Sequence, residues 1–425
     1  MMQAGRGPEG LPRLLYGLDP SGRAMSLAEH ERLHGSLPAP APGELVEALE
    51  LSGLRGRGGA DFPTAQKLRA VLDRGGRGAL IVNGNETEPA GAKDRLLLSR
   101  LPHLVLDGAL LSANAINARE VIVTLPESSV SAHSALEEAI AERGREASRV
   151  RLVAFPAGYV NGEESAVVHY LERGAALPTF VPPRPYERGL RGRPTLIQNA
   201  ETLAQVGLIA RYGEHWYREL GTSADPGTAL ITITGAVATP GVYELAFGTS
   251  IEHLLGAAGG PSEPLQALLV GGYFGTWVRA QEAMQLRLAR EDLRSVGSSL
   301  GAGVILALGQ SACGLHESAR VIDYLASESA GQCGPCVYGL RAIADAFGAL
   351  ADGNANPGER EHVLRWSEEV RGRGACHHPD GAVRFVQSSL SVFGEDLEWH
   401  RNSRCTARPA GLPMRRGSRR EAVLR

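Results

Sequence analysis

One glycine-dense stretch, Leu54 to Lys67, constrains this chain more than any other part of its sequence, and it reads L-R-G-R-G-G-A-D-F-P-T-A-Q-K. Its three clustered glycines let the backbone adopt positive φ and turn N–H groups toward an anion, as in concavities that hold phosphate. Two interspersed arginines add positive charge. Pro63 then opens an amphipathic run, Ala65 to Asp73, so the loop leads into a helix N-terminus. The stretch predicts a phosphate cradle, with an ordinary glycine turn as the alternative.

The bulk composition excludes several classes of function. The chain has 425 residues, 43% of them hydrophobic, which is enough for two or three domains with their own cores. A net charge of −3 and an aromatic content of 5% argue against nucleic-acid binding. No apolar run approaches the roughly 20 residues that span a bilayer, and no secretory signal pattern opens the sequence. We therefore expect a cytoplasmic protein that neither binds nucleic acid nor inserts directly into a membrane.

Alternating strand and helix patterns predict the fold class. Apolar or β-branched runs such as Val121 to Leu125 and Val150 to Phe155 alternate with helical patterns such as Ser131 to Arg145. This alternation is typical of a parallel sheet covered by helices. A small β-rich module follows, and helical patterns prevail from His316 onward. We expect an α/β fold in which a Rossmann-like α/β domain is followed by a β-grasp module and a C-terminal helical bundle with a cysteine loop.

Shifts in composition set the expected domain boundaries. Residues 1–43 mix Gly, Pro and Arg, which predicts a partly disordered or loosely docked extension. The expected α/β domain covers residues 44–224 and the β-grasp module residues 225–303. The helical domain is then expected over residues 304–395, and an Arg-rich, frayed tail over residues 396–425.

Two further strand-to-helix turns carry polar side chains. Asn83 to Arg95 reads N-G-N-E-T-E-P-A-G-A-K-D-R, and Gly158 to Ser165 reads G-Y-V-N-G-E-E-S. Amides and carboxylates at the carboxyl ends of strands suit the donor and acceptor edges of a heterocycle or a ribityl chain. The alternatives are a plain surface loop for the first turn and helix capping by Glu163 and Glu164 for the second.

The odd number of cysteines predicts metal or redox chemistry rather than a disulfide framework. Glu328 to Cys336 reads E-S-A-G-Q-C-G-P-C, and Cys376 follows in G-A-C-H-H-P-D-G. A C-x2-C turn with Gly and Pro, opening a helix, is typical of a thiolate loop for a metal or a cluster. Zinc bound by three cysteines and one histidine, His377 or His378, is an alternative, and so is a thioredoxin-like redox pair.

In this order, the motifs resemble the flavin-carrying, NADH-oxidising subunit of respiratory complex I and its relatives in hydrogenases and formate dehydrogenases. The resemblance runs from about Leu51 to Phe393. It rests on G-L-R-G-R-G-G-A-x-F-P-T-x-x-K, the loop ending in K-D-R, the G-E-E-S turn, G-R-P-T-x-x-x-N-x-E-T-L and the cysteine loop. A P-G-V-Y turn within Ile231 to Gly260 is similar to the SLBB-type β-grasp domain found there. The resemblance implies FMN, an iron–sulfur centre, NAD(P)H as electron donor, and a partner redox protein such as a ferredoxin or a cluster-bearing subunit.

The resemblance also implies a set of site residues. Those expected to bind cofactor are Gly56, Arg57, Gly58, Gly59, Phe62, Lys67, Asn83, Asn85, Glu86, Gly162, Glu163, Glu164, Gln198 and Asn199. Glu86 and Glu164 are the expected catalytic residues, and Glu164 would face the nicotinamide nucleotide. The expected metal ligands are Cys333, Cys336 and Cys376.

The chain departs from the family pattern at the cysteine loop. Ala330 stands where the family has its first cluster cysteine, which implies a non-standard, three-cysteine centre. A three-cysteine [3Fe–4S] cluster, a cluster with His377, His378, Cys405 or water as fourth ligand, zinc, and no metal all stay open. Otherwise Cys313 and Cys405 are expected to be a buried small residue and a tail thiol.

Further departures affect the flavin and nucleotide sites. Asp61 replaces a glycine of the cradle, where a carboxylate is unfavourable unless it points away from the phosphate. Asn85 replaces an aspartate, and Gln198 one of two paired asparagines. Two aromatic positions that would stack on adenine are Ala70 and Arg184, which leaves NADH, NADPH or neither open.

These patterns together predict an FMN-dependent oxidoreductase that passes electrons from NAD(P)H or another donor, via flavin, to an iron–sulfur centre or a partner redox protein. The alternative is a cofactor-poor accessory or docking subunit that keeps the fold, with zinc as a stabilising option.

Overall fold

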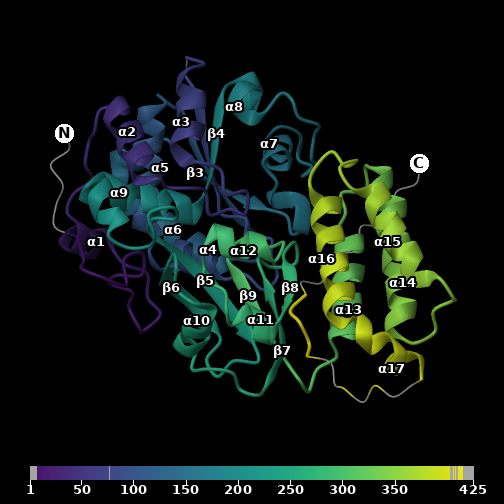
Figure 1. Cartoon of the computed structure of the whole chain (residues 1–425). Coiled ribbons are helices and arrows are strands. Elements are labelled where there is room, and N and C mark those ends of the chain that lie inside the picture. The colour runs from purple at the N-terminus through teal and green to yellow at the C-terminus, as the bar shows by residue number, and fades with distance from the viewer. Residues whose placement is uncertain (1–6, 76, 403–404, 406, 408–409, 415–425) are drawn as a thin grey trace.

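The computed structural model describes residues 7–75, 77–402, 405, 407 and 410–414. The expectations for residues 1–6 and for the last part of the Arg-rich tail, residues 415–425, lie outside the described residues. In the described part, an α/β half, a second sheet and a bundle of helices follow one another from the N-terminus to the C-terminus (Figure 1). The predicted fold class is confirmed.

The first sheet has four parallel strands in the order β3-β2-β1-β4. Its strands are β1 (Ala79–Asn83), β2 (Val121–Pro126), β3 (Val150–Phe155) and β4 (Thr195–Asn199). The helices of this half are α1 (Leu27–His34), α2 (Pro42–Ser52), α3 (Thr64–Leu72), α4 (Lys93–Arg100), α5 (Pro102–Ala115), α6 (Val130–Arg143), α7 (Glu164–Arg173), α8 (Pro185–Arg188) and α9 (Ala200–Arg218). Because the strands are parallel, their carboxyl ends meet at one edge, where both polar turns emerge.

Alternation of side chains along β1 explains the layers around this sheet. Leu80 and Val82 face a large core that includes α5 and α9, while Ala79 and Ile81 face a smaller core that includes Val167 of α7. Successive residues of a strand point to opposite faces, and both faces of β1 are covered by apolar side chains. The continuous apolar run A-L-I-V therefore reports a strand buried on both sides.

The second sheet has five strands in the order β6-β5-β9-β7-β8, and only the pair β5–β9 is parallel. Its strands are β5 (Thr228–Gly235), β6 (Gly241–Ala246), β7 (Leu265–Val270), β8 (Thr276–Arg279) and β9 (Val304–Gly309). Three short helices accompany them: α10 (Ile251–Ala257), α11 (Ala280–Ala283) and α12 (Arg290–Ser295). One face packs against α10 and the other against the C-terminal helices.

The C-terminal helices stand side by side at one end of the molecule (Figure 1). They are α13 (Gly314–Ser327), α14 (Arg341–Ala351), α15 (Glu359–Val370), α16 (His378–Phe393) and the short α17 (Leu397–Arg401), with a π-helical turn, Pro335–Leu340, before α14. Their shared core includes Phe347, Phe385 and Phe393, none of them more than 1% exposed.

The N-terminal segment is docked more firmly than a loosely attached extension would be. Leu14 is fully buried, and His30 of α1 lies 2.6 Å, Nε2 to Oδ2, from the buried Asp107 of α5. Arg13 donates to the carbonyl of Trp216 and lies over its ring. The described part of this segment therefore packs against α5 and α9, because its few apolar and aromatic side chains find buried partners there.

Within the described residues, no single helix has both the length and the apolar composition needed to cross a membrane. The bent pair α4 and α5, 94° apart, meets that requirement only when the two are counted together.

Candidate functional site

A cavity of about 540 Å³ opens where the α/β half, the second sheet and the C-terminal helices meet. The first half contributes the glycine loop and both polar turns, the second sheet contributes Gly271 and Gly301, and the start of α16 contributes His378. The sequence-predicted residues that line it are Arg57, Gly58, Gly59, Asn83, Asn85, Glu86, Gly162, Glu163, Asn199 and Cys376. Residues spread over more than 300 positions are thus brought to one site.

Other predicted residues lie close to the cavity without lining it. These are Gly56, Phe62, Lys67, Glu164, Gln198, Cys333 and Cys336. The N–H of Gly56 donates to the carbonyl of Phe62 at 2.8 Å and closes the glycine loop. Lys67 contacts Glu164 directly, so α3 and α7 are joined by an ion pair at the edge of the site.

The glycine loop needs its glycines for two separate reasons. Gly59 has φ of +102°, in the left-handed region that residues with a Cβ avoid. A Cβ on Gly58 would lie 3.2 Å from Cβ of Asn199, so this glycine allows close approach to β4. Arg57 anchors the loop from inside, because its guanidinium donates to the Tyr217 hydroxyl at 3.0 Å and its N–H to Oγ1 of Thr202 at 2.9 Å.

Asp61 points away from this cavity. Its carboxylate accepts from Nε of Arg55 at 2.8 Å and lies 3.9 Å from Nη1 of Arg290. It lines a neighbouring cavity of about 310 Å³ together with Arg294. The glycine loop lines both cavities, and the Asp61 charge is paired with Arg55 on the side of the smaller one.

Three asparagines at the carboxyl ends of β1 and β4 each donate a side-chain hydrogen bond to a neighbouring group. Asn83 donates from Nδ2 to the carbonyl of Gly162 at 2.8 Å, and Asn199 donates to Oδ2 of Asp94 at 2.7 Å while capping α9. Asn85 donates to Oγ1 of Thr124 at 2.9 Å, but its Oδ1 is buried and has no protein partner. A buried, unpaired acceptor at a cavity indicates a position where a ligand donates.

Glu86 and Lys93 place two buried charged groups beneath the cavity. Glu86 accepts the N–H groups of Asp94 and Arg95, each at 3.2 Å. Burial raises the pKa of Glu86 to about 7, and the neighbouring Asp94 adds to the rise. Nζ of Lys93 lies 2.9 Å from Oε2 of Glu201 and 3.1 Å from Oδ1 of Asp94. Burial works against the charge of Lys93, but the two carboxylates outweigh it and raise its pKa.

Glu163 acts as a helix cap. Its carboxylate accepts the N–H groups of Ser165 and Ala166, each at 3.0 Å, at the start of α7. The capping alternative for this residue is therefore present in the structure, and Glu163 lines the cavity as well.

Sequence reasoning missed several residues of the site. Tyr159 donates its hydroxyl to the buried Glu88 at 2.9 Å, and Glu88 also accepts the N–H of Tyr273 at 2.8 Å. Both Tyr159 and Glu88 lie inside the two polar turns, so the motifs contain them although their chemistry did not single them out. Phe274 and Arg384 come from loops and helices outside those motifs, where no sequence signal pointed to the cavity.

The predicted cysteine ligands gather beside the cavity. Cys376 lines it, and Cys333 and Cys336 open the π-helical turn, with the N–H of Cys336 donating to the carbonyl of Cys333 at 3.0 Å. Burial raises the pKa of Cys336 to about 12, and Cys376 and Cys333 add to that rise because they stand close by. The N–H of Tyr159 donates to Glu328 at 2.8 Å, which ties the cysteine loop to the second polar turn.

The structure distinguishes among the expected fourth ligands. His377 is exposed and pairs with Asp380 at 3.1 Å. His378 is buried, its Nε2 faces the carbonyl of Leu325 at 2.8 Å, and its Nδ1 has no protein partner. Cys405 is not with the other three cysteines. Cys313 is buried and Cys405 is a free thiol of the tail, as expected, and Cys405 lies beside Cys313, His316 and His400.

This fold and this site define a class of protein, namely a flavoprotein of the oxidoreductase type with an iron–sulfur region. Residues 49–208 match the model described as the Nuo51 FMN-binding domain, and residues 230–272 match the SLBB domain. Residues 316–400 match the NADH-ubiquinone oxidoreductase-F iron-sulfur binding region. The chain belongs to the family of F subunits of NADH-quinone oxidoreductases. The sequence-based resemblance is thereby confirmed.

Individual relatives resemble the chain over most of its length. The F 2 subunit of the NADH-quinone oxidoreductase of Rhizobium meliloti is 32% identical over 92% of this chain and 97% of its own. The F subunit of the Escherichia coli enzyme is 33% identical over 87% of each chain. Among solved structures, a chain of an NAD+-reducing [NiFe]-hydrogenase in the H2-reduced state superimposes with a TM-score of 0.78 at 32% identity. That match covers 84% of this chain and 63% of the hydrogenase chain.

Proposed function

We propose that the chain binds FMN in the 540 Å³ cavity and transfers electrons from NADH, through the flavin, to an iron–sulfur centre beside it. The observation that carries the proposal is the cavity itself, because it joins the glycine loop, the polar turns and Cys376 in one space. FMN supplies the conversion between a two-electron donor and one-electron acceptors.

The residues present fit FMN. A Cβ added at Gly58 would lie 3.2 Å from its nearest neighbour, and one added at Gly162 would lie 3.0 Å from its nearest neighbour. The cavity wall therefore has no room for a side chain at either glycine. The unpaired Oδ1 of Asn85 offers an acceptor for a ring N–H. Asn83 and Asn199 hold Gly162 and Asp94 in place, and Glu86 with Lys93 supports the floor through buried polar contacts.

The cysteine loop fits a centre held by three thiolates. Cys333, Cys336 and Cys376 provide these, and Ala330 provides none. His378 has a ring nitrogen available to a ligand, since its Nδ1 is unpaired while its Nε2 faces a backbone carbonyl. We therefore favour a three-cysteine iron–sulfur centre, with His378 or water completing it. From there electrons would pass to a partner redox protein.

The nucleotide site is the less complete part of the proposal. Phe62 is 49% exposed at the loop edge and is available to stack on an adenine or nicotinamide ring. Ala70 and Arg184 replace the other stacking positions, so NADH would bind more weakly, and Arg184 favours a phosphorylated nucleotide. Glu164, paired with Lys67, would then meet the nucleotide. The cytoplasmic location stays a prediction.

The test compares alanine substitutions at two glycines that both have positive φ. Gly59→Ala places a Cβ at φ +102° within the cavity, and Gly174→Ala places one at φ +74° at the C-terminal end of α7 with nothing within 4 Å. Both variants should lose about 1 kcal/mol of stability. Only Gly59→Ala should lose FMN affinity, measured by quenching of flavin fluorescence.

The wild-type chain, purified without oxygen, should contain FMN, iron and sulfide, and should reduce an artificial acceptor with NADH. A chain that stays colourless after FMN is added would exclude the proposal and favour the alternative, a cofactor-poor docking subunit. Equal loss of FMN affinity in both glycine variants would show that the cavity is not the flavin site.

A further inference from the structure

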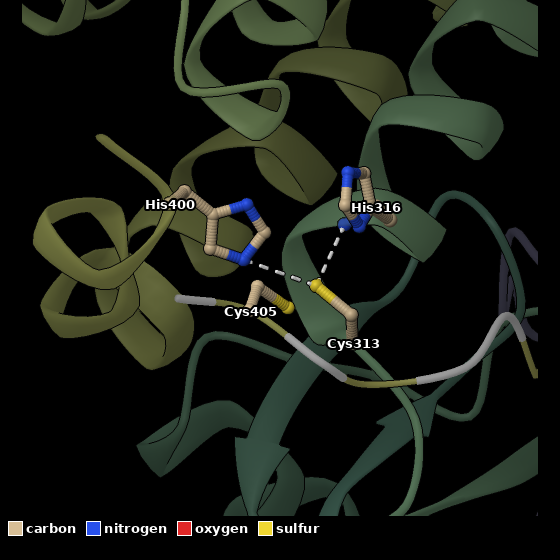
Figure 2. A group of neighbouring side chains, drawn as sticks. All are labelled: Cys313, His316, His400 and Cys405. Carbon is tan, nitrogen blue, oxygen red and sulfur yellow. Dashed lines mark hydrogen bonds between the residues drawn. The ribbon is translucent and has the colours of Figure 1, made fainter. Parts of the chain in front are cut away.

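Four sulfur and nitrogen ligands converge at a second place, away from the flavin cavity. Cys313 and His316 come from the start of α13, His400 comes from α17, and Cys405 follows α17 (Figure 2). We call these four residues the Cys313 group. One ligand atom from each lies within 4.8 Å of every other. In the described part of the chain, this is the one such group of three or more potential metal ligands.

The ligand atoms of the Cys313 group are close enough together to share one ion. Sγ of Cys313 lies 3.3 Å from Nε2 of His400, and the rings of His316 and His400 have centroids 4.9 Å apart. Ligands at zinc bond lengths of about 2.0 to 2.3 Å stand about 3.5 Å from one another in a tetrahedron. The four side chains therefore need only small rotations to surround one ion. Figure 2 shows them pointing toward a common space.

The sequence spacing also suits a metal. Cys313 and His316 form C-x2-H, and His400 and Cys405 form H-x4-C. Two pairs of close ligands, separated by a long intervening segment, are the usual arrangement in structural zinc sites. The intervening segment here contains the whole helical bundle.

His400 is oriented by a second contact that selects its ligand atom. Its Nδ1 contacts the carbonyl of Ala351, which can only accept a hydrogen bond. The proton of the neutral ring therefore sits on Nδ1, and the lone pair on Nε2 faces Sγ of Cys313. Metal-bound histidines are held in the same way by a carbonyl or carboxylate behind them. Oδ1 of Asp352 lies 3.6 Å from Nε2 of His316, a carboxylate beside the second ring.

The chemistry of the Cys313 group selects zinc over harder cations. Two thiols and two imidazoles are soft and borderline ligands, and they offer none of the oxygen atoms that Mg²⁺ and Ca²⁺ prefer. The ligand atoms of both cysteines lie within 4.8 Å of those of the two histidines, so a bound Zn²⁺ would contact all four as the thiol protons leave.

We propose that the Cys313 group binds a structural Zn²⁺ ion that fastens the C-terminal segment to the start of α13. Gly411 and Leu412 also contact α13, because their N–H groups donate to its buried Glu317 at 3.2 and 3.1 Å. Leu412 is 4% exposed, and Tyr273 donates to the carbonyl of Pro413. The ion would hold the segment at one end and Glu317 would hold it farther along.

Metal content of single-cysteine variants tests the proposal. The full chain should contain about one zinc ion besides its iron. Cys405→Ser should lower zinc affinity at least about tenfold and leave iron unchanged. Cys333→Ser is the matched control, because it should lower iron and leave zinc unchanged. Loss of zinc from Cys333→Ser, or loss of iron from Cys405→Ser, would overturn the assignment.

Two further measurements keep the test independent of protein folding. Co²⁺ substituted for Zn²⁺ in the wild-type chain should give the visible absorption of a tetrahedral thiolate site, and Cys405→Ser should remove it. Chelation should speed hydrogen exchange at the Gly411 and Leu412 amides. A disulfide between Cys313 and Cys405 in protein purified under reducing conditions, or a chain free of zinc, would contradict the proposal.

Discussion

At the scale of single residues, the 540 Å³ cavity contains a carboxyl group with a raised pKa, that of Glu86. Its folded pKa is about 7, raised by burial and then by Asp94, whereas the ordinary value is 4.5. The unfolded chain therefore releases this proton at lower pH than the folded chain does. Ionising Glu86 is harder in the folded chain than in the unfolded one. The protonated form therefore contributes its full stabilisation of the fold below pH 4.5, and this stabilisation declines as the pH rises to about 7.

We expect the FMN-free chain to lose on the order of 3 kcal/mol of unfolding free energy across that window because of Glu86. Glu86→Gln should remove this part of the pH dependence of the unfolding free energy, although the amide loses one of the acceptors that Asp94 and Arg95 use. Urea unfolding at several pH values measures this pH dependence for the variant and for the wild type. Parallel curves for the variant and the wild type would show that Glu86 does not titrate in this range.

The two lysines of the chain offer a comparison between elements. Lys93 begins α4 and joins it to α9 through Glu201, and all three charges, with Asp94, are buried. Lys67 of α3 joins Glu164 of α7, whose side chain is 41% exposed. A buried pair that loses one partner leaves an uncompensated charge, whereas an exposed pair is screened by water.

Lys93→Met should therefore destabilise the chain by about 3 to 5 kcal/mol, and Lys67→Met by less than about 1 kcal/mol. Urea midpoints measure the difference. Lys93→Met combined with Glu201→Gln should recover part of the loss, because one of the two buried carboxylates left without Lys93 is removed. Similar midpoints for the two single variants would mean that water reaches Glu201.

The crossing of α5 and α9 is closest at Gly108. A Cβ on Gly108 would lie 1.8 Å from the carbonyl oxygen of Leu203, a backbone atom that cannot move without shifting α9. Gly108→Ala should cost at least about 3 kcal/mol of stability. Gly256→Ala in α10 is the control, because nothing lies within 4 Å of the added atom. That variant should be neutral or up to about 1 kcal/mol more stable. Equal thermal midpoints for the two variants would exclude a tight crossing.

Elements with a strong local pattern can be predicted from the sequence. The pattern over Val150–Phe155 predicts a strand at its observed bounds, since a short, mainly apolar run between polar segments has few alternatives. Apolar periodicity predicts the last long helix from Val383, but α16 starts at His378, because His378 and Pro379 form a first turn buried against other elements. Short elements such as β8 and α12 give no clear signal, because four to six residues carry too little periodicity to stand out.

At the scale of the whole molecule, the site is predictable only where one motif contains it. The glycine loop, the two polar turns and Cys376 can be predicted from the sequence, because the residues of each motif indicate a ligand by themselves. Phe274, Gly301 and Arg384 cannot, because only the packing of three parts of the chain brings them to the cavity. The Cys313 group is hidden for the same reason, since more than 80 residues separate its two pairs of ligands.

That convergence predicts how FMN acts on the whole chain. The cavity takes Asn83 from the first sheet, Gly271 from the second, and Gly381 from α16, so one ligand contacts all three parts. A ligand that binds only the folded chain stabilises it by about 2.7 kcal/mol at a hundredfold excess over Kd. Hydrogen exchange should therefore slow near all three residues on addition of FMN, with the Ser250–Ala258 region around α10 as the unaffected reference. Protection confined to the Asn83 turn would show that the flavin contacts the α/β half alone. The C-terminal helices would then receive electrons from FMN without contributing to its binding.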